Sequence, residues 1–211
     1  FALVALLMLP FLPLYKVEAL DPLAPLPAKV RRLPLVFTLF AIFLFQAANM
    51  GLFAYTIGLG KAEGLTIEFI SPALAAGSWV ALFGSMLVII IGTKYGRTLP
   101  LLGAILLTSL CSYLLIYSEI SAVYLIANII IGITWAFALP YMFGICSELD
   151  KAGQLAALGG FASKMGLATG PMTAALLLGD DNYQRLIYIA AAVLVLCAAV
   201  VYKPASLLDK I

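Results

Sequence analysis

Polar side chains that could bind a ligand are few in this sequence and stand singly inside long apolar runs. Gln46 and Asn49 are three residues apart, so both lie on one face of a helix. Asn128, Gly132 and Trp135 share a second helical face. Amides hydrogen-bond polar ligand groups, and an indole ring stacks on ring-bearing or apolar molecules. These spacings favour a small-molecule site, although helix packing would use the same amides and a packed or lipid-facing tryptophan is the alternative.

Lys164 is a cation deep inside an apolar run, within the stretch GGFASKMGLATGP. A lysine at this depth either lines a wet cavity or snorkels to the membrane surface. It lies about 160° around the helix from a stripe of small residues, Ala162, Gly166, Gly170 and Ala174, which ends beside Pro171. Small side chains let two helices approach closely in lipid. We therefore expect the stripe to pack on a neighbouring helix and Lys164 to face elsewhere.

Several kinds of chemistry are disfavoured by what the sequence lacks. It contains no histidine, which excludes His-based catalytic dyads and triads and disfavours zinc and haem sites. None of its 10 acidic residues falls in the central part of an apolar run, so a paired-carboxylate centre is not expected there. Cys111, Cys146 and Cys197 stand alone without CxxC spacing and are predicted to be small buried hydrophobes. We expect no enzyme activity, no metal and no cofactor.

Composition places these residues in a membrane protein. Of the 211 residues, 64% are hydrophobic and 10% charged, and the mean hydropathy is +1.13. A net charge of +2 with dispersed cations gives no indication of nucleic-acid binding. The predicted fold is an all-α integral membrane bundle in a lipid bilayer, since backbone polar groups must pair within each span. Six apolar runs are long enough to cross, at about residues 34–59, 72–92, 99–117, 121–147, 155–178 and 185–202.

The flanking segments and the cations predict the organisation around these spans. Residues 1–14 would give roughly 21 Å of helix, short of a ~30 Å hydrocarbon core, so we expect the end of a preceding span in a longer protein. Residues 15–33 are expected to form a polar linker, and residues 203–211 a tail. With both on one side, that side has nine Lys and Arg against two, Lys61 and Arg185, on the other. This bias predicts a cytoplasmic linker and C-terminus.

Two loops resemble sequence signatures of one transporter family. GTKYGRTLP matches the cytoplasmic Asp-Arg-x-Gly-Arg signature of the major facilitator superfamily at Lys94, Gly96 and Arg97, with Thr93 in place of the Asp. LDKAGQ keeps its Asp-x-x-Gly spacing in Asp150 and Gly153. Without the first Asp, a latch on the cytoplasmic side must be weaker or use another carboxylate. Alternatively, Lys94 and Arg97 serve only as positive-inside topology signals.

The resemblance implies that residues 34–202 are the C-terminal six-helix half of such a transporter, with an N-terminal six-span half as its partner. It implies transport of a small molecule by alternating access, in a bacterial inner membrane. Export of a hydrophobic compound is favoured over sugar or metabolite uptake, because the predicted lining is aromatic and poor in amides. The alternative from another class is a non-transporting scaffold or signalling protein that reuses the fold.

Overall fold

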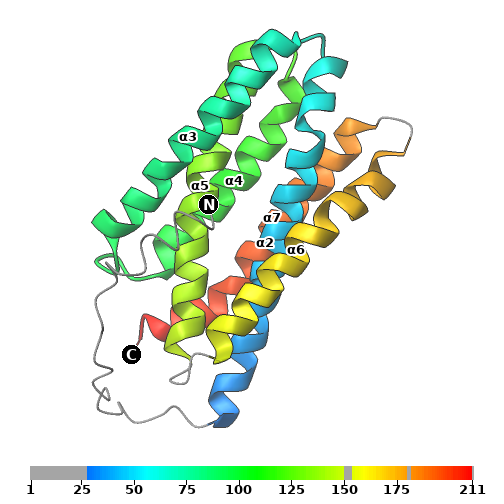
Figure 1. Cartoon of the computed structure of the whole chain (residues 1–211). Coiled ribbons are helices and arrows are strands. Elements are labelled where there is room, and N and C mark those ends of the chain that lie inside the picture. The colour runs from blue at the N-terminus through cyan, green and yellow to red at the C-terminus, as the bar shows by residue number, and fades with distance from the viewer. Residues whose placement is uncertain (1–27, 150–153, 180–181, 211) are drawn as a thin grey trace, which may run out of the picture.

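The computed structural model describes residues 28–149, 154–179 and 182–210. Within these ranges the chain is helical (Figure 1), with a short 3-10 turn at Leu115–Tyr117 and the helices α2 Ala28–Ala62, α3 Ile67–Ile91, α4 Thr98–Leu114, α5 Ser121–Glu148, α6 Gln154–Leu178 and α7 Tyr183–Leu208. The expected end of a span at 1–14 lies outside the described residues, as does the linker up to residue 27. Residues 28–33, expected in the linker, instead form the first turns of α2.

A helix covers each of the six predicted spans, but not all of them have the composition of a membrane span. Five helices in the described ranges, α2, α3, α4, α5 and α7, are long and apolar enough to cross a membrane, which indicates a multi-pass membrane protein. The predicted span 155–178 is the exception. It forms α6, which contains glycines, threonines, Pro171 and Lys164 and is not among those five.

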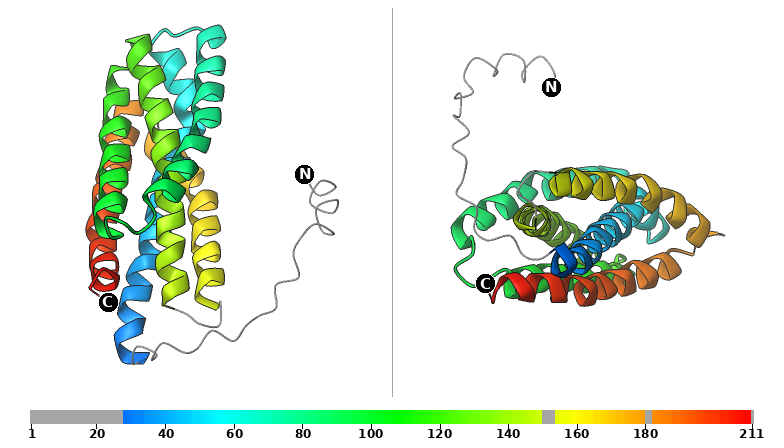
Figure 2. Two further views of the ribbon diagram at one scale, coloured as in Figure 1. Left: turned by 90° about the vertical axis from the view of Figure 1, so that its left-hand side faces the viewer. Right: turned by 90° about the horizontal axis from the view of Figure 1, so that it is seen from below.

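The helices lie in three layers (Figure 2). Seen from below, α3 and α6 form one layer, α4 and α7 the opposite one, and α2 and α5 lie between them. Helix α2 packs on α6 and α7, while α5 packs on α3 and α4, and α4 packs on α7. This pairing maps onto itself when α2, α3 and α4 are exchanged with α5, α6 and α7. Because α2 and α5 run in opposite directions (Figure 1), the arrangement is that of an inverted three-helix repeat.

Glycines make the closest helix contacts on both sides of this repeat. A Cβ on Gly166 would lie 2.5 Å from the Phe43 carbonyl oxygen of α2, and one on Gly170 would lie 2.5 Å from the Ala47 carbonyl oxygen. Between α3 and α5, a Cβ on Gly132 would lie 2.6 Å from the Gly77 carbonyl oxygen. Apolar side chains gain little by leaving lipid for each other, so close backbone approach holds these pairs together.

The buried residues form two clusters along the bundle. One includes Phe45 and Met142, and the other includes Ile70 and Tyr124. All three cysteines are free and buried, which confirms the prediction that they serve as small hydrophobes.

Candidate functional site

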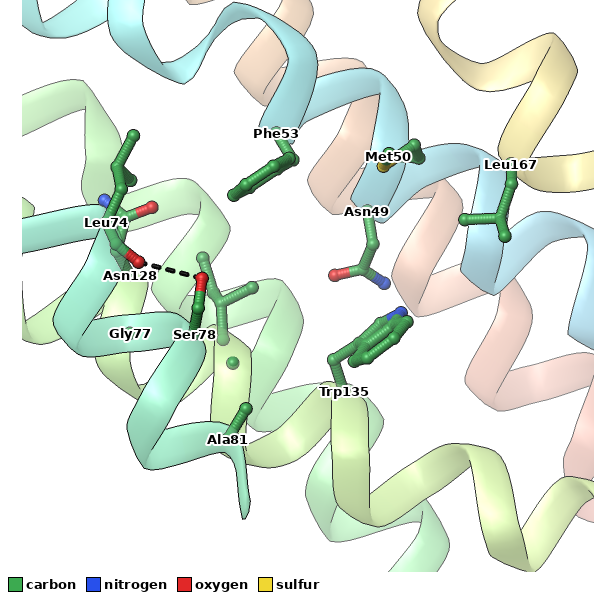
Figure 3. Close-up of a pocket in the computed structure, with 12 residues that line it drawn as sticks. Asn49, Met50, Phe53, Leu74, Gly77, Ser78, Ala81, Asn128, Trp135 and Leu167 are labelled. Atoms are coloured by element: carbon green, nitrogen blue, oxygen red, sulfur yellow. Dashed lines mark hydrogen bonds between the residues drawn. The ribbon is translucent and has the colours of Figure 1, made fainter. Parts of the chain in front are cut away.

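A mainly apolar cavity of about 400 Å³ lies between α2, α3, α5 and α6 (Figure 3). Four residues that were grouped by spacing contribute to its wall: Asn49, Asn128, Gly132 and Trp135. They are joined by residues that the sequence analysis did not single out, among them Phe53, Ser78 and Leu167. Trp135 is near the middle of α5, and Asn49 is near the middle of α2. The cavity is therefore at mid-height in the bundle, where a membrane-spanning protein has least access to water.

Gln46 is held between three helices beside this cavity. Its Nε2 donates to Ser163 Oγ on α6 at 2.8 Å, and its Oε1 accepts a hydrogen bond from Trp135 Nε1 on α5 at 2.8 Å. The side chain is almost fully buried. Gln46 thus joins α2, α5 and α6 and orients the Trp135 ring. Because the indole N–H is already bonded, Trp135 offers a ligand its ring surface.

Asn49 has an unused acceptor. Its Nδ2 donates to the Phe45 carbonyl oxygen one turn earlier at 2.7 Å. A carbonyl oxygen accepts only a donor, so this bond determines which end of the amide is oxygen. Oδ1 is buried and has no hydrogen-bond partner within the described part of the chain, although the residue is 8% exposed. In Figure 3 the Asn49 amide lies between Phe53 and Trp135, with its oxygen turned toward the open space.

Asn128 repeats this arrangement on α5. Its Nδ2 donates to the Tyr124 carbonyl oxygen at 2.8 Å, so its amide is oriented in the same way. The two asparagines end matching sequences, FQAAN at residues 45–49 and YLIAN at residues 124–128. Each has an aromatic residue four positions before the asparagine and an alanine directly before it. These matching segments are a sequence signal that α2 and α5 occupy equivalent positions in the repeat. The sequence analysis did not identify this signal.

The structure separates Lys164 from the small-residue stripe of α6. Gly166, Gly170 and Ala174 are buried, Ala162 is half-buried, and Lys164 is exposed. Pro171 lies within α6 and its carbonyl oxygen is 3.4 Å from Tyr55 Oη. Helix α6 contributes Leu167, rather than Lys164, to the cavity wall. A role for Lys164 in a transport pathway stays a prediction.

A charged cluster joins four segments at the end of the bundle where the α3–α4 loop lies. Arg97 pairs with Glu148 at the end of α5, and its Nη1 is 3.9 Å from Asp209 Oδ1 just after α7. Asp209 also accepts hydrogen bonds from the backbone N–H groups of Arg97 and Thr98, at 2.6 Å and 2.9 Å. The carboxylate therefore caps the N-terminus of α4, where the helix dipole favours negative charge.

The surroundings of Asp209 change its proton affinity. Partial burial raises the pKa of this carboxyl, but the Thr98 hydroxyl, the two backbone N–H groups and the Arg97 charge outweigh it, so the pKa lies below its ordinary value. Gly96 adopts φ +70, and a Cβ there would lie 2.9 Å from Asp209 Oδ2. Glycine is needed at this position for both reasons.

The charged cluster bears on the expectation that a latch at the GTKYGRTLP loop must use a carboxylate other than the signature Asp. Thr93 has no carboxylate. Glu148 and Asp209, neither of which was predicted, are the carboxylates that interact with Arg97. Lys94 is exposed. Asp150 and Gly153 lie outside the described residues. Both missed carboxylates are far from Arg97 in sequence, so no local spacing pointed to them.

Comparisons with known proteins do not assign the chain to a family. Neither protein-family models nor curated proteins match it. Among the described residues, His, Cys, Asp and Glu nowhere gather into a group that could hold a metal ion.

Proposed function

We propose that this protein is a transporter of small molecules, built as the C-terminal six-helix half of a major facilitator superfamily permease. A second six-helix unit, the N-terminal half, would complete the pathway, and the substrate would be exposed alternately to the two sides of a bacterial inner membrane. The proposal takes the charged end of the bundle, with the linker and C-terminus, as cytoplasmic. The main observation behind the transport proposal is the cavity at mid-height in the bundle. Residues of four helices line this cavity, and Gln46 lies beside it.

Two further features support the proposal. The inverted three-helix pairing is the repeat pattern from which such halves are built, with substrate sites near the bilayer midplane. The cluster of Arg97, Glu148 and Asp209 ties helix ends together in a loop that resembles the family signature. Its ion pairs are suited to a gate, because partly exposed pairs are weak enough to break and reform. The mainly apolar wall favours a hydrophobic substrate.

Access to the cavity tests alternating access without knowledge of the substrate. Ser78 is exposed and lines the cavity, so Ser78→Cys should react with a membrane-impermeant maleimide. The experiment uses the protein with both halves and all native cysteines replaced by serine, in right-side-out and inside-out vesicles. We expect labelling from both sides. Labelling from one side alone, or from neither, would contradict the proposed transport mechanism.

Leu106→Cys is the matched control. Leu106 is 48% exposed near the middle of α4, in the layer opposite α3, and should not react from either side because it faces lipid. The 211-residue chain by itself should insert into liposomes without transporting, since it would supply only one wall of the pathway. Transport by that chain alone would show that the half-transporter assignment is wrong.

A further inference from the structure

The cavity wall has features that select a class of ligand. We propose that it binds an uncharged, ring-bearing molecule with a hydrogen-bond donor, which donates to Asn49 Oδ1 while its ring lies between Phe53 and Trp135. This inference rests on the proposed function, because it assigns a substrate class to the same cavity. The test of this inference is a binding measurement. The ligand class can therefore be wrong while the transport proposal holds, and the transport proposal can be wrong while the ligand class holds.

The need for a donor follows from Asn49. Its Oδ1 is buried and has no hydrogen-bond partner among the described residues, and a buried acceptor that stays unsatisfied loses its hydration without compensation. The bond from Nδ2 to the Phe45 carbonyl oxygen prevents the amide from turning around. A ligand hydroxyl or N–H group would satisfy this oxygen, whereas an ether or a hydrocarbon would leave it unpaired.

The other polar groups of the wall also direct their donors away. Asn128 Nδ2 donates to the Tyr124 carbonyl oxygen, and Ser78 Oγ donates to the Leu74 carbonyl oxygen at 3.0 Å, the bond drawn in Figure 3. The Trp135 indole N–H is bonded to Gln46. What these groups present to a ligand is acceptor oxygen, so the site selects donors.

The absence of charge and the two rings define the rest of the ligand. None of the residues that line the cavity is ionisable, so a carboxylate or phosphate would be buried without a counter-ion. Phe53 and Trp135 stand on two sides of the open space in Figure 3, where a flat ring can contact both. A volume of about 400 Å³ is suited to a small organic molecule.

Trp135 itself can report binding. The chain has two tryptophans, and Trp79 is 74% exposed, so Trp79→Phe leaves Trp135 as the single tryptophan. The probes are 4-bromophenol, which has a donor, and 4-bromoanisole, in which a methyl group replaces that donor. Bromine quenches indole emission on contact, so titration of the full chain in lipid nanodiscs gives an apparent affinity for each. We expect saturable quenching by 4-bromophenol and none by the anion 4-bromobenzoate.

Asn49→Leu separates the acceptor from the apolar cavity. The two probes partition differently into lipid, but that difference is the same for every variant. The affinity ratio of bromophenol to bromoanisole should fall about tenfold in Asn49→Leu, equivalent to about 1.4 kcal/mol. Thr56→Val, which removes another buried polar group of α2 bonded within its own helix, should keep the original ratio. Asn49→Ala replaces Asn49→Leu if the latter does not insert.

Two results would overturn the inference. One is an unchanged probe ratio in Asn49→Leu or Asn49→Ala, because the acceptor would then have no part in binding. The other is occupation by a lipid chain, in which lipids brominated on their acyl chains quench Trp135 and added phenol does not relieve the quenching. Relief of that quenching by phenol would support the ligand site.

Discussion

The close contact of α6 with α2 predicts a large effect from a single methyl group. In Gly170→Ala, the new Cβ would lie 2.5 Å from the Ala47 carbonyl oxygen and 3.0 Å from the Gly51 nitrogen. An ordinary contact begins near 3.4 Å, so the two helices must separate by 3.4 − 2.5 = 0.9 Å. Overpacking of this kind costs roughly 1–3 kcal/mol. Alanine returns up to about 1 kcal/mol through its better helix propensity.

Gly160→Ala is the matched control, because Gly160 lies on the same helix and a Cβ there would have no described atom within 4 Å. It gains the same propensity without the clash, so the difference in unfolding free energy between the two variants isolates the clash, about 1–3 kcal/mol. At about 2–4 °C per kcal/mol for a chain of this size, Gly170→Ala should melt measurably below Gly160→Ala.

Thermal unfolding in detergent can be followed with a thiol-reactive fluorescent dye. Cys111, Cys146 and Cys197 are all buried and free, so they react only as the bundle opens. We expect the melting temperatures to rank Gly160→Ala at or above the unmodified protein, with Gly170→Ala lowest. If Gly170→Ala melted together with Gly160→Ala, the idea that this glycine is needed for backbone contact would be refuted.

Three further predictions concern charge and orientation. Because the pKa of Asp209 is lowered on folding, its stabilisation is present above the ordinary value of 3.8 and is lost as pH falls through the lowered value; acid melting curves of Asp209→Asn should lack that loss, and identical pH dependence would contradict it. In a cysteine-free background, Glu119→Cys should react with impermeant maleimide from outside the cell and Tyr95→Cys should not; the reverse pattern would invert the topology. In the protein with both halves, Lys164→Met should abolish transport and Lys164→Arg restore part of it, whereas normal transport by Lys164→Met would leave a snorkelling lysine.

Much of the secondary structure could be predicted because it depends on local properties. Apolar runs must be helical in lipid, so their positions predicted where the helices lie. The start of α2 at Ala28 differs from the prediction, because residues 15–33 are polar and contain prolines, a pattern that favours a linker. The span over residues 155–178 stays a prediction, because α6 is helical there but is not among the five helices that are apolar enough to cross a membrane by composition.

Helical periodicity explains why part of the candidate site could also be predicted from the sequence. Residues three, four or seven apart share a face in any α-helix, so the grouping of Asn128 with Trp135 needed no tertiary information. The FQAAN and YLIAN segments contained a further signal, because the same geometry recurs on α2 and α5.

Which helix faces met each other was decided by the tertiary structure. Gln46 lies 117 residues from Ser163 and 89 from Trp135, and Arg97 lies 112 residues from the Asp209 carboxylate that caps α4. The helices, the stripe of small residues and the scarcity of charge follow from composition and helical period, which can be found without tertiary information. Only packing decided that Gln46 would be saturated and Asn49 left with a free oxygen, because hydrogen-bond partners on other helices depend on rotation and register that no single helix encodes.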